Sequence, residues 1–174
     1  MAQKAFKAVF NNDFVSSNAN AALQLYEQAR FGEIVGGKVH YSFAEALYLL
    51  QKKKLAIFKD EKKAGFDSLM RHAQKKDKNF FSRFMVYSDL RNKGYIVKTA
   101  LKFGADFRVY EKGKKPGQEH SKWIVYPVYE SGAMTWHDFA AKNRVAHSTK
   151  KNLLVGIVDE EGDVSYYEIR WLKP

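Results

Sequence analysis

The chain has 174 residues, 45% of them hydrophobic and 15% aromatic, which suffices for a buried core and excludes wholesale disorder. It contains no cysteine, so a disulfide scaffold, a thiolate metal site and a cysteine nucleophile are excluded. The 30 basic and 19 acidic residues give a net charge of +11, which favours a polyanionic partner such as nucleic acid. No apolar run could span a bilayer and no signal peptide is visible, so we expect a soluble, cytoplasmic protein with no membrane partner.

The first half of the chain predicts a small α+β domain. Asn18 is expected to cap a helix, and Ser42 with Glu45 has the spacing of a capping box for another. The expected elements are a strand at 4–10, a segment at 14–15 that pairs back on it, helices at 19–30 and from 43, a strand at 55–58 and a helix at 67–75.

The second half predicts a mixed sheet with one or two helices. Thr135 can cap a helix that runs to about residue 146, and the segment 153–158 is apolar on both faces, as in an interior strand. The other expected elements are a helix at 79–92, strands at 95–101, 105–110 and 123–129, an acidic turn at 159–163 and a last strand at 164–172. The fold class is therefore α+β, with an N-terminal α+β domain at 1–82 and a C-terminal mixed-sheet domain at 83–174.

Metal and phosphate-loop motifs are missing from the sequence. It has no HExxH motif, no zinc-spaced histidine pair, no EF-hand loop, no Walker A motif and no GxGxxG. Nucleases that use a divalent cation need acidic residues on neighbouring strands, whereas the strand at 153–158 has no carboxylate before Asp159, and Asp106 stands alone early in its strand. We therefore expect neither a metal nor a cofactor.

His120 is the histidine with the most suggestive surroundings. It lies in a glycine- and lysine-rich loop between two predicted strands, and Tyr110 ends the first of them. Metal-free RNA cleavage needs a base for the 2′-hydroxyl, an acid for the departing 5′-oxygen and a cation for the phosphorane. Histidine titrates near neutrality and can be the acid, whereas tyrosine can be the base only if a cation stabilises its phenolate. Packing remains an alternative role for the tyrosine.

Residues 85–174 resemble the catalytic domain of the archaeal tRNA-splicing (tRNA-intron) endonucleases. The matching stretches are MVYSDLRNKGYIVKTALKFGADFRVYEKG at 85–113, EHSKWIVYPV at 119–128, RVAHSTKKNLLVGIVDEEGDVSYYEI at 144–169 and the terminal LKP. The first half resembles that family more weakly, through YSFAEALYLL at 41–50.

The resemblance implies a catalytic triad and a site for RNA bases. Tyr110 corresponds to the family's base, His120 to its acid and Lys151 to its transition-state stabiliser. Arg144 corresponds to an arginine that contacts flipped bulge bases, although a helix salt bridge is an alternative role for it. Arg170 lies near the position of a second such arginine. The implied catalytic domain is restriction-endonuclease-like.

The resemblance also implies an assembly and a substrate. Family members of this length form homotetramers, act on precursor tRNA with a bulge–helix–bulge motif, and leave 2′,3′-cyclic phosphate and 5′-hydroxyl ends. In such tetramers an acidic loop docks into a basic cleft of a neighbouring subunit, and the matching residues here are Asp159, Glu160, Glu161 and Asp163. The last strand is expected to form the isologous dimer interface.

Two other functions stay open at this point. The chain could be an RNA-binding subunit that is active only with a partner chain, a role that the intact triad disfavours. It could also be a metal-dependent nuclease on a similar fold, because fold alone does not fix chemistry. Insensitivity of cleavage to a chelator would separate the metal-dependent enzyme from the metal-independent one.

Overall fold

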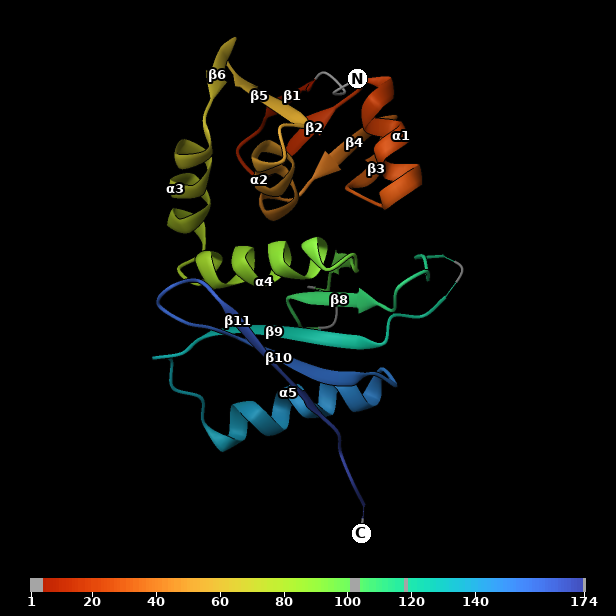
Figure 1. Cartoon of the computed structure of the whole chain (residues 1–174), viewed down its shortest axis with the longest axis vertical. Helices are drawn as coiled ribbons and strands as arrows, with labels where there is room; N and C mark the ends of the chain where they lie inside the picture. Colours follow the sequence, from red (N-terminus) through yellow and green to blue (C-terminus); the bar gives the residue numbers. More distant parts are fainter. Residues whose placement is uncertain (1–4, 101–103, 118, 174) are drawn as a thin grey trace. The chain divides into compact units, whose positions relative to one another are not determined.

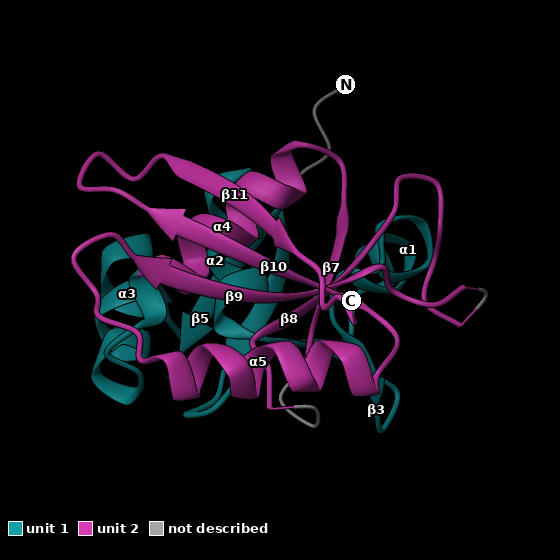
Figure 2. Cartoon of the chain, turned by 90° about the horizontal axis from the view of Figure 1, so that it is seen from below, with its two compact units in different colours: residues 1–81 teal, residues 82–174 magenta. Residues whose placement is uncertain are grey.

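The computed structural model describes residues 5–100, 104–117 and 119–173. The chain divides into two compact units, Met1–Phe81 and Ser82–Pro174, which are coloured separately in Figure 2. The division into domains at 1–82 and 83–174 stays a prediction. Among the described residues, no helix has both the length and the apolar character needed to cross a membrane.

Unit 1 is built on a six-stranded mixed sheet in the order β3-β4-β2-β1-β5-β6. β1 and β5 are parallel, and the other neighbours are antiparallel. In chain order its elements are β1 (Phe6–Phe10), β2 (Val15–Ser17), α1 (Asn20–Ala29), β3 (Glu33–Val35), β4 (Lys38–Tyr41), α2 (Phe43–Gln51), β5 (Leu55–Lys59), β6 (Lys62–Ala64) and α3 (Phe66–Lys76) (Figure 1).

The core of unit 1 lies between one face of this sheet and α2. Ala8, Val15, Val39 and Ile57 are buried on that face because alternate strand residues point the same way. The capping box starts α2 as predicted, since Ser42 accepts from the Glu45 backbone N–H while the Glu45 carboxylate accepts from Ser42.

The predicted cap of α1 is wrong. Its N-cap residue is Ala19, which has no capping side chain, and Asn18 lies one residue earlier. The Ser17 hydroxyl accepts from the Ala19 backbone N–H at 3.2 Å, so a serine turn takes the place of an asparagine cap.

Unit 2 is a helix–sheet–helix layer. Its five-stranded sheet has the order β11-β10-β9-β8-β7, with β9 and β10 parallel and the remaining neighbours antiparallel. The elements are α4 (Phe80–Asn92), which begins at the boundary between the units, β7 (Ile96–Thr99), β8 (Phe107–Tyr110), β9 (Trp123–Tyr129), α5 (Trp136–Ser148), β10 (Asn152–Val158) and β11 (Val164–Ile169).

The two helices lie on opposite faces of that sheet (Figure 1). Ala146 and Phe139 of α5 pack with Ile124, Leu153 and other apolar strand residues. α4 approaches β10 closely because position 156 is glycine: a Cβ there would lie 2.9 Å from a Val86 methyl. The predicted fold class is thus confirmed, as are the interior strand at 153–158 and the Thr135 cap of α5, whose hydroxyl accepts from the Asp138 backbone N–H.

Candidate functional site

Five strand ends meet at one edge of the unit 2 sheet. β8 runs antiparallel to β9, and β9 runs parallel to β10, so the end of β8 lies beside the starts of β9 and β10. The pairing of Ile96 with Tyr110 adds the start of β7, and that of Leu153 with Ile169 adds the end of β11. Tyr110 ends β8, Lys151 immediately precedes β10 and His120 lies on the loop entering β9. We call this the catalytic edge, after the roles expected for these three residues.

Tyr110 is held rigidly at this edge. The residue is only 4% exposed and pairs with Ile96 across β7 and β8. No hydrogen bond of its phenol group is found within the described ranges, so that hydroxyl keeps its donor and acceptor capacity.

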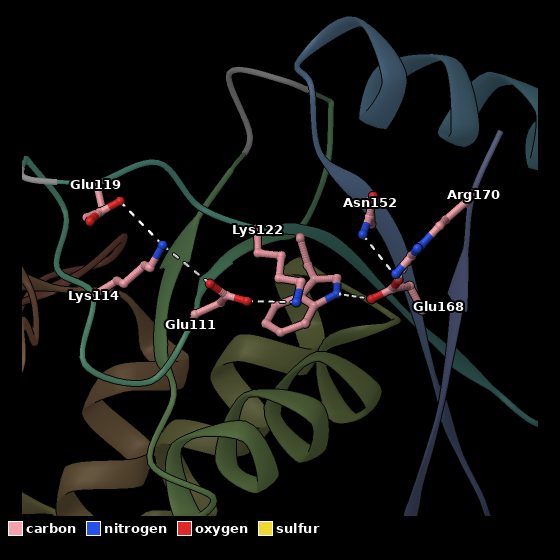
Figure 3. Close-up of polar contacts among 8 residues, drawn as sticks. Glu111, Lys114, Glu119, Lys122, Asn152, Glu168 and Arg170 are labelled. Carbon is pink, nitrogen blue, oxygen red and sulfur yellow. Dashed lines mark hydrogen bonds and ion pairs between the residues drawn. The ribbon is translucent and has the colours of Figure 1, made fainter. Parts of the chain in front are cut away.

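His120 is exposed, and its ring forms no hydrogen bond or ion pair in the described part of the chain. The loop that carries His120 is anchored by ion pairs between its charged residues (Figure 3). The Lys122 ammonium donates to the Glu111 carboxylate at 2.7 Å, and the Lys114 ammonium lies 3.4 Å from Glu111 and 3.5 Å from Glu119. These bonds fix both ends of the loop from Glu111 to Lys122 and therefore limit where His120 can move.

Lys151 is half-buried and already oriented. Its ammonium donates to the Thr149 carbonyl at 2.8 Å. Burial, and then the positive charge of Arg108, lower the pKa of Lys151 below its usual value. Arg108 lies two residues before Tyr110 on β8, so the two side chains share a face of the sheet.

The two candidate RNA-binding arginines differ in their surroundings. Arg144 is exposed on α5, and the alternative role in a helix salt bridge finds no support, since the described residues show no ion pair to it. Arg170, just after β11, is engaged by Glu168 through its Nε at 2.7 Å. Glu168 also accepts from Trp123 Nε1 at 2.6 Å and from Asn152 at 3.1 Å (Figure 3). The hydrogen bond from Trp123, followed by the bond and charge of Arg170, lowers the pKa of the Glu168 carboxyl.

The acidic turn lies between β10 and β11. Asp159 stabilises the turn, because its carboxylate accepts a hydrogen bond from the Asp163 backbone N–H at 2.8 Å. Glu160, Glu161 and Asp163 are exposed, and no cation is paired with them among residues 5–100, 104–117 and 119–173. Three carboxylates therefore face solvent without a counter-charge, at the opposite end of β10 from Lys151.

The carboxylates do not form a metal site. Among the described residues, no three His, Asp or Glu side chains are placed to hold an ion together. Asp106, the lone strand carboxylate, is paired with Arg83 at 2.5 Å and is only 13% exposed.

The sequence prediction missed Arg108 and the charged residues that anchor the loop. Strand alternation could have found Arg108, because it lies two positions before Tyr110 in a predicted strand. Nothing in the sequence pattern signals that Glu111 meets Lys122, since a loop of unknown path separates them.

Comparison with known proteins gives two family matches and many relatives. Residues 80–166 match the catalytic C-terminal domain of tRNA intron endonucleases, and residues 6–70 match the N-terminal domain of the same enzymes. The chain is 43% identical to the tRNA-splicing endonuclease of Thermococcus onnurineus over 158 residues, which is 91% of each chain. It is 40% identical to that of Pyrococcus horikoshii over 98% of this chain and 99% of the relative. With the enzyme of Nanoarchaeum equitans the identity is 46%, over 75% of this chain and 87% of the relative.

Proposed function

The chain belongs to the tRNA intron endonuclease family and has that family's function, and from this premise we propose how it acts: it excises introns from precursor tRNA at bulge–helix–bulge sites without a metal ion. The observation that carries the mechanism is the catalytic edge. It brings a strand-end tyrosine, a loop histidine and a half-buried lysine to one edge, and none of the three is paired with a carboxylate among the described residues.

The proposed reaction is an internal transfer at the scissile phosphate. Tyr110 takes the proton of the 2′-hydroxyl, and the 2′-oxygen forms a bond to phosphorus. His120 gives a proton to the 5′-oxygen as the bond from phosphorus to that oxygen breaks. The products are a 2′,3′-cyclic phosphate and a 5′-hydroxyl, and no water or ion is consumed.

Lys151 is proposed to stabilise the phosphorane. Its bond to the Thr149 carbonyl holds the ammonium before substrate arrives, so little reorganisation is needed when negative charge develops. A tyrosine can act as a base only where a cation lies near it, and Arg108 lies on the same face of the sheet as Tyr110.

Arg144 and Arg170 are the proposed contacts to the RNA outside the scissile phosphate. Exposed Arg144 is unpaired in the described chain, so its guanidinium can stack on an unpaired base and bind phosphate at the same time. Arg170 must first give up part of its pairing with Glu168, which makes it the weaker contact of the two.

We propose a homotetramer assembled through the acidic turn. The unpaired carboxylates of Glu160 and Glu161 repel one another unless a basic surface of another subunit meets them. Charge reversal at both positions should convert tetramers to dimers in light scattering, whereas reversal of Glu27 and Glu61, which are exposed elsewhere, should not. An unchanged tetramer mass after the first reversal would refute this assembly.

Single-turnover cleavage of a synthetic precursor tRNA tests the catalytic roles. His120→Ala should slow cleavage by about 10²–10⁴-fold with RNA affinity retained, and His137→Ala, at an exposed histidine of α5, should not. Lys151→Gln should slow it by about 10²–10³-fold, against little change for Lys150→Gln next to it. Equal loss of rate and of RNA affinity in His120→Ala would mean that His120 has a structural role instead.

A further inference from the structure

One face of the unit 1 sheet is partly open to solvent: Ser16 on it is 8% exposed, but its neighbours on β1 and β4 are more exposed. Register places Val9, Ser16 and His40 directly across from one another on β1, β2 and β4. Lys7 and Lys38 lie two residues away on the same face, and both are exposed. Val9 is 57% exposed, although Ala8, which points to the opposite face, is 2% exposed. We call this the open face of the sheet.

The open face is hollowed and carries an aromatic platform. A hollow of about 390 Å³ lies over β1, β2 and β4, within the range of about 300–1,000 Å³ typical of ligand sites. In its lining the rings of Phe14 and His40 stack at 4.3 Å between centroids, with planes only 13° apart. Asn11, Ser16 and Asn18 add amide and hydroxyl groups to the same lining.

The open face carries more positive than negative charge, because Lys7 and Lys38 share it with one carboxylate, Glu33, directly across from His40. Lys7 and Lys38 both line the hollow, and neither is paired with a carboxylate in the described part of the chain. The Lys7 ammonium lies 5.6 Å from the centre of the Phe58 ring, which holds it over the face. The nearest carboxylate in register is Glu33, on the outermost strand β3.

We propose that the open face binds a single-stranded segment of the RNA substrate, with a base on the Phe14–His40 platform and the flanking phosphates on Lys7 and Lys38. Aromatic rings bind the faces of unstacked bases, and lysines neutralise phosphates. Amide and hydroxyl groups beside the platform can pair with base edges or the ribose 2′-hydroxyl. The proposal rests on the proposed function only in assuming an RNA substrate. It does not depend on the mechanism by which that RNA is cleaved.

Equilibrium binding of a fluorescent single-stranded oligouridine and of precursor tRNA tests the proposal. Lys7→Ala/Lys38→Ala should weaken binding about tenfold and make the salt dependence shallower by about 1.4 in log–log slope, since about 0.7 is lost per phosphate contact. Lys62→Ala/Lys75→Ala removes the same charge from exposed sites off this face and should leave the slope unchanged. Equal effects of the two pairs would overturn the proposal.

Phe14→Leu tests the platform separately, because it keeps an apolar side chain and removes the stacking surface. It should weaken oligouridine binding at least fivefold without changing the melting temperature by more than about 2 °C. If the lysine pair instead lowers the mass of the assembly and leaves RNA affinity intact, a second copy of the chain covers this face and the proposal fails. Absence of cleavage with RNA binding intact would refute the proposed function alone.

Arg108, on the catalytic edge, has a guanidinium group that is not fully satisfied by hydrogen bonds. Its Nε is buried and has no hydrogen-bond partner, and no ion pair to its guanidinium is found within residues 5–100, 104–117 and 119–173. Register pairs Arg108 with Ile124, and Ile124 with Leu153, which lies two residues after Lys151, so the two cations lie at the same end of the sheet. The charge of Arg108 accordingly lowers the pKa of Lys151. Two neighbouring cations, one with an unsatisfied buried donor, are costly to hold without an anion.

The geometry points to Arg108 as a residue that binds a non-bridging oxygen of the scissile phosphate beside Lys151. A phosphate placed between the guanidinium and the ammonium would remove their repulsion, and it would lie on the face of the sheet that bears Tyr110. This inference also rests on the proposed function.

Arg108→Met distinguishes this role from a structural one. Cleavage of saturating RNA should slow by about 10–10³-fold, while the melting temperature of the RNA-free protein stays equal or rises, because an unpaired cation has been removed. Arg108→Lys should recover part of the rate. A lower melting temperature with an unchanged cleavage rate would show that Arg108 supports the fold and not the phosphate.

Discussion

Gly156→Ala should destabilise the protein through the contact between α4 and β10. Gly156 is buried in β10, and a Cβ at this position would lie 2.9 Å from one methyl of Val86 and 3.3 Å from the other. Val86 is fully buried in α4, and a β-branched side chain in a helix has one strongly preferred rotamer. The valine therefore cannot turn both methyl groups away, and either the helix or the strand must shift.

The magnitude follows from two opposing terms. Overpacking of a well-packed core costs about 1–3 kcal/mol, and replacing glycine by alanine returns about 0.5–1 kcal/mol of backbone entropy. The net loss is about 0–2.5 kcal/mol and is centred near about 1 kcal/mol, which corresponds to a fall of about 2–4 °C in melting temperature for a chain of this size.

A double-mutant cycle measured by denaturant unfolding tests the contact directly. Val86→Ala removes the methyl groups that the new Cβ would strike, so Gly156→Ala should cost at least about 1 kcal/mol less in that background than in the native protein. Additive effects of the two substitutions would refute the reasoning.

Three further predictions concern titrating groups and a helix cap. Because its pKa is lowered, Lys151 should lose its proton at a lower pH than an ordinary lysine. The cleavage rate should therefore begin to fall at a lower alkaline pH than an ordinary lysine would cause. In Arg108→Gln, which removes one cause of the lowered pKa, this fall should move to higher pH. Thr135→Ala should cost about 1 kcal/mol of unfolding free energy through loss of the N-cap, measured by denaturant titration. The hydrogen bond from Thr135 lowers the pKa of the Asp138 carboxyl. The part of the lost unfolding free energy that comes from this bond should therefore be largest near neutral pH and should shrink as pH falls through the lowered pKa. Glu111→Gln should speed amide hydrogen exchange in the loop that carries His120, and an unchanged exchange rate would mean that the Lys122 bond does not restrain it.

Much of unit 2 could be predicted because its signals are local. The strand at 153–158 is apolar on both faces, as a strand covered by helices on both sides must be, and Thr135 lies at the N-cap of its helix. The hairpin of β3 and β4 in unit 1 was missed because its first strand is short and exposed, although Gly36-Gly37 between the strands is a hairpin signal. The Asn18 cap failed because the adjacent Ser17 supplied the turn.

The candidate site was predictable only in part. Tyr110, His120 and Lys151 could be named from the resemblance, and strand order then explains why Tyr110, Lys151 and the loop carrying His120 reach one edge of the sheet. The parallel pairing of β9 and β10 decides this arrangement, and no pattern within either strand reveals it. The open face of unit 1 depends likewise on the pairing of β2 with both β1 and β4.

The central claim is metal-independent cleavage by this chain without a partner protein. Its most direct test is incubation of the purified chain with a precursor tRNA containing a bulge–helix–bulge, in excess EDTA, followed by analysis of the new RNA ends. We expect two cuts, each leaving a 2′,3′-cyclic phosphate and a 5′-hydroxyl. Cleavage that appears only when Mg²⁺ is added to RNA shown to be folded without it, or only when a second protein is supplied, would contradict the account.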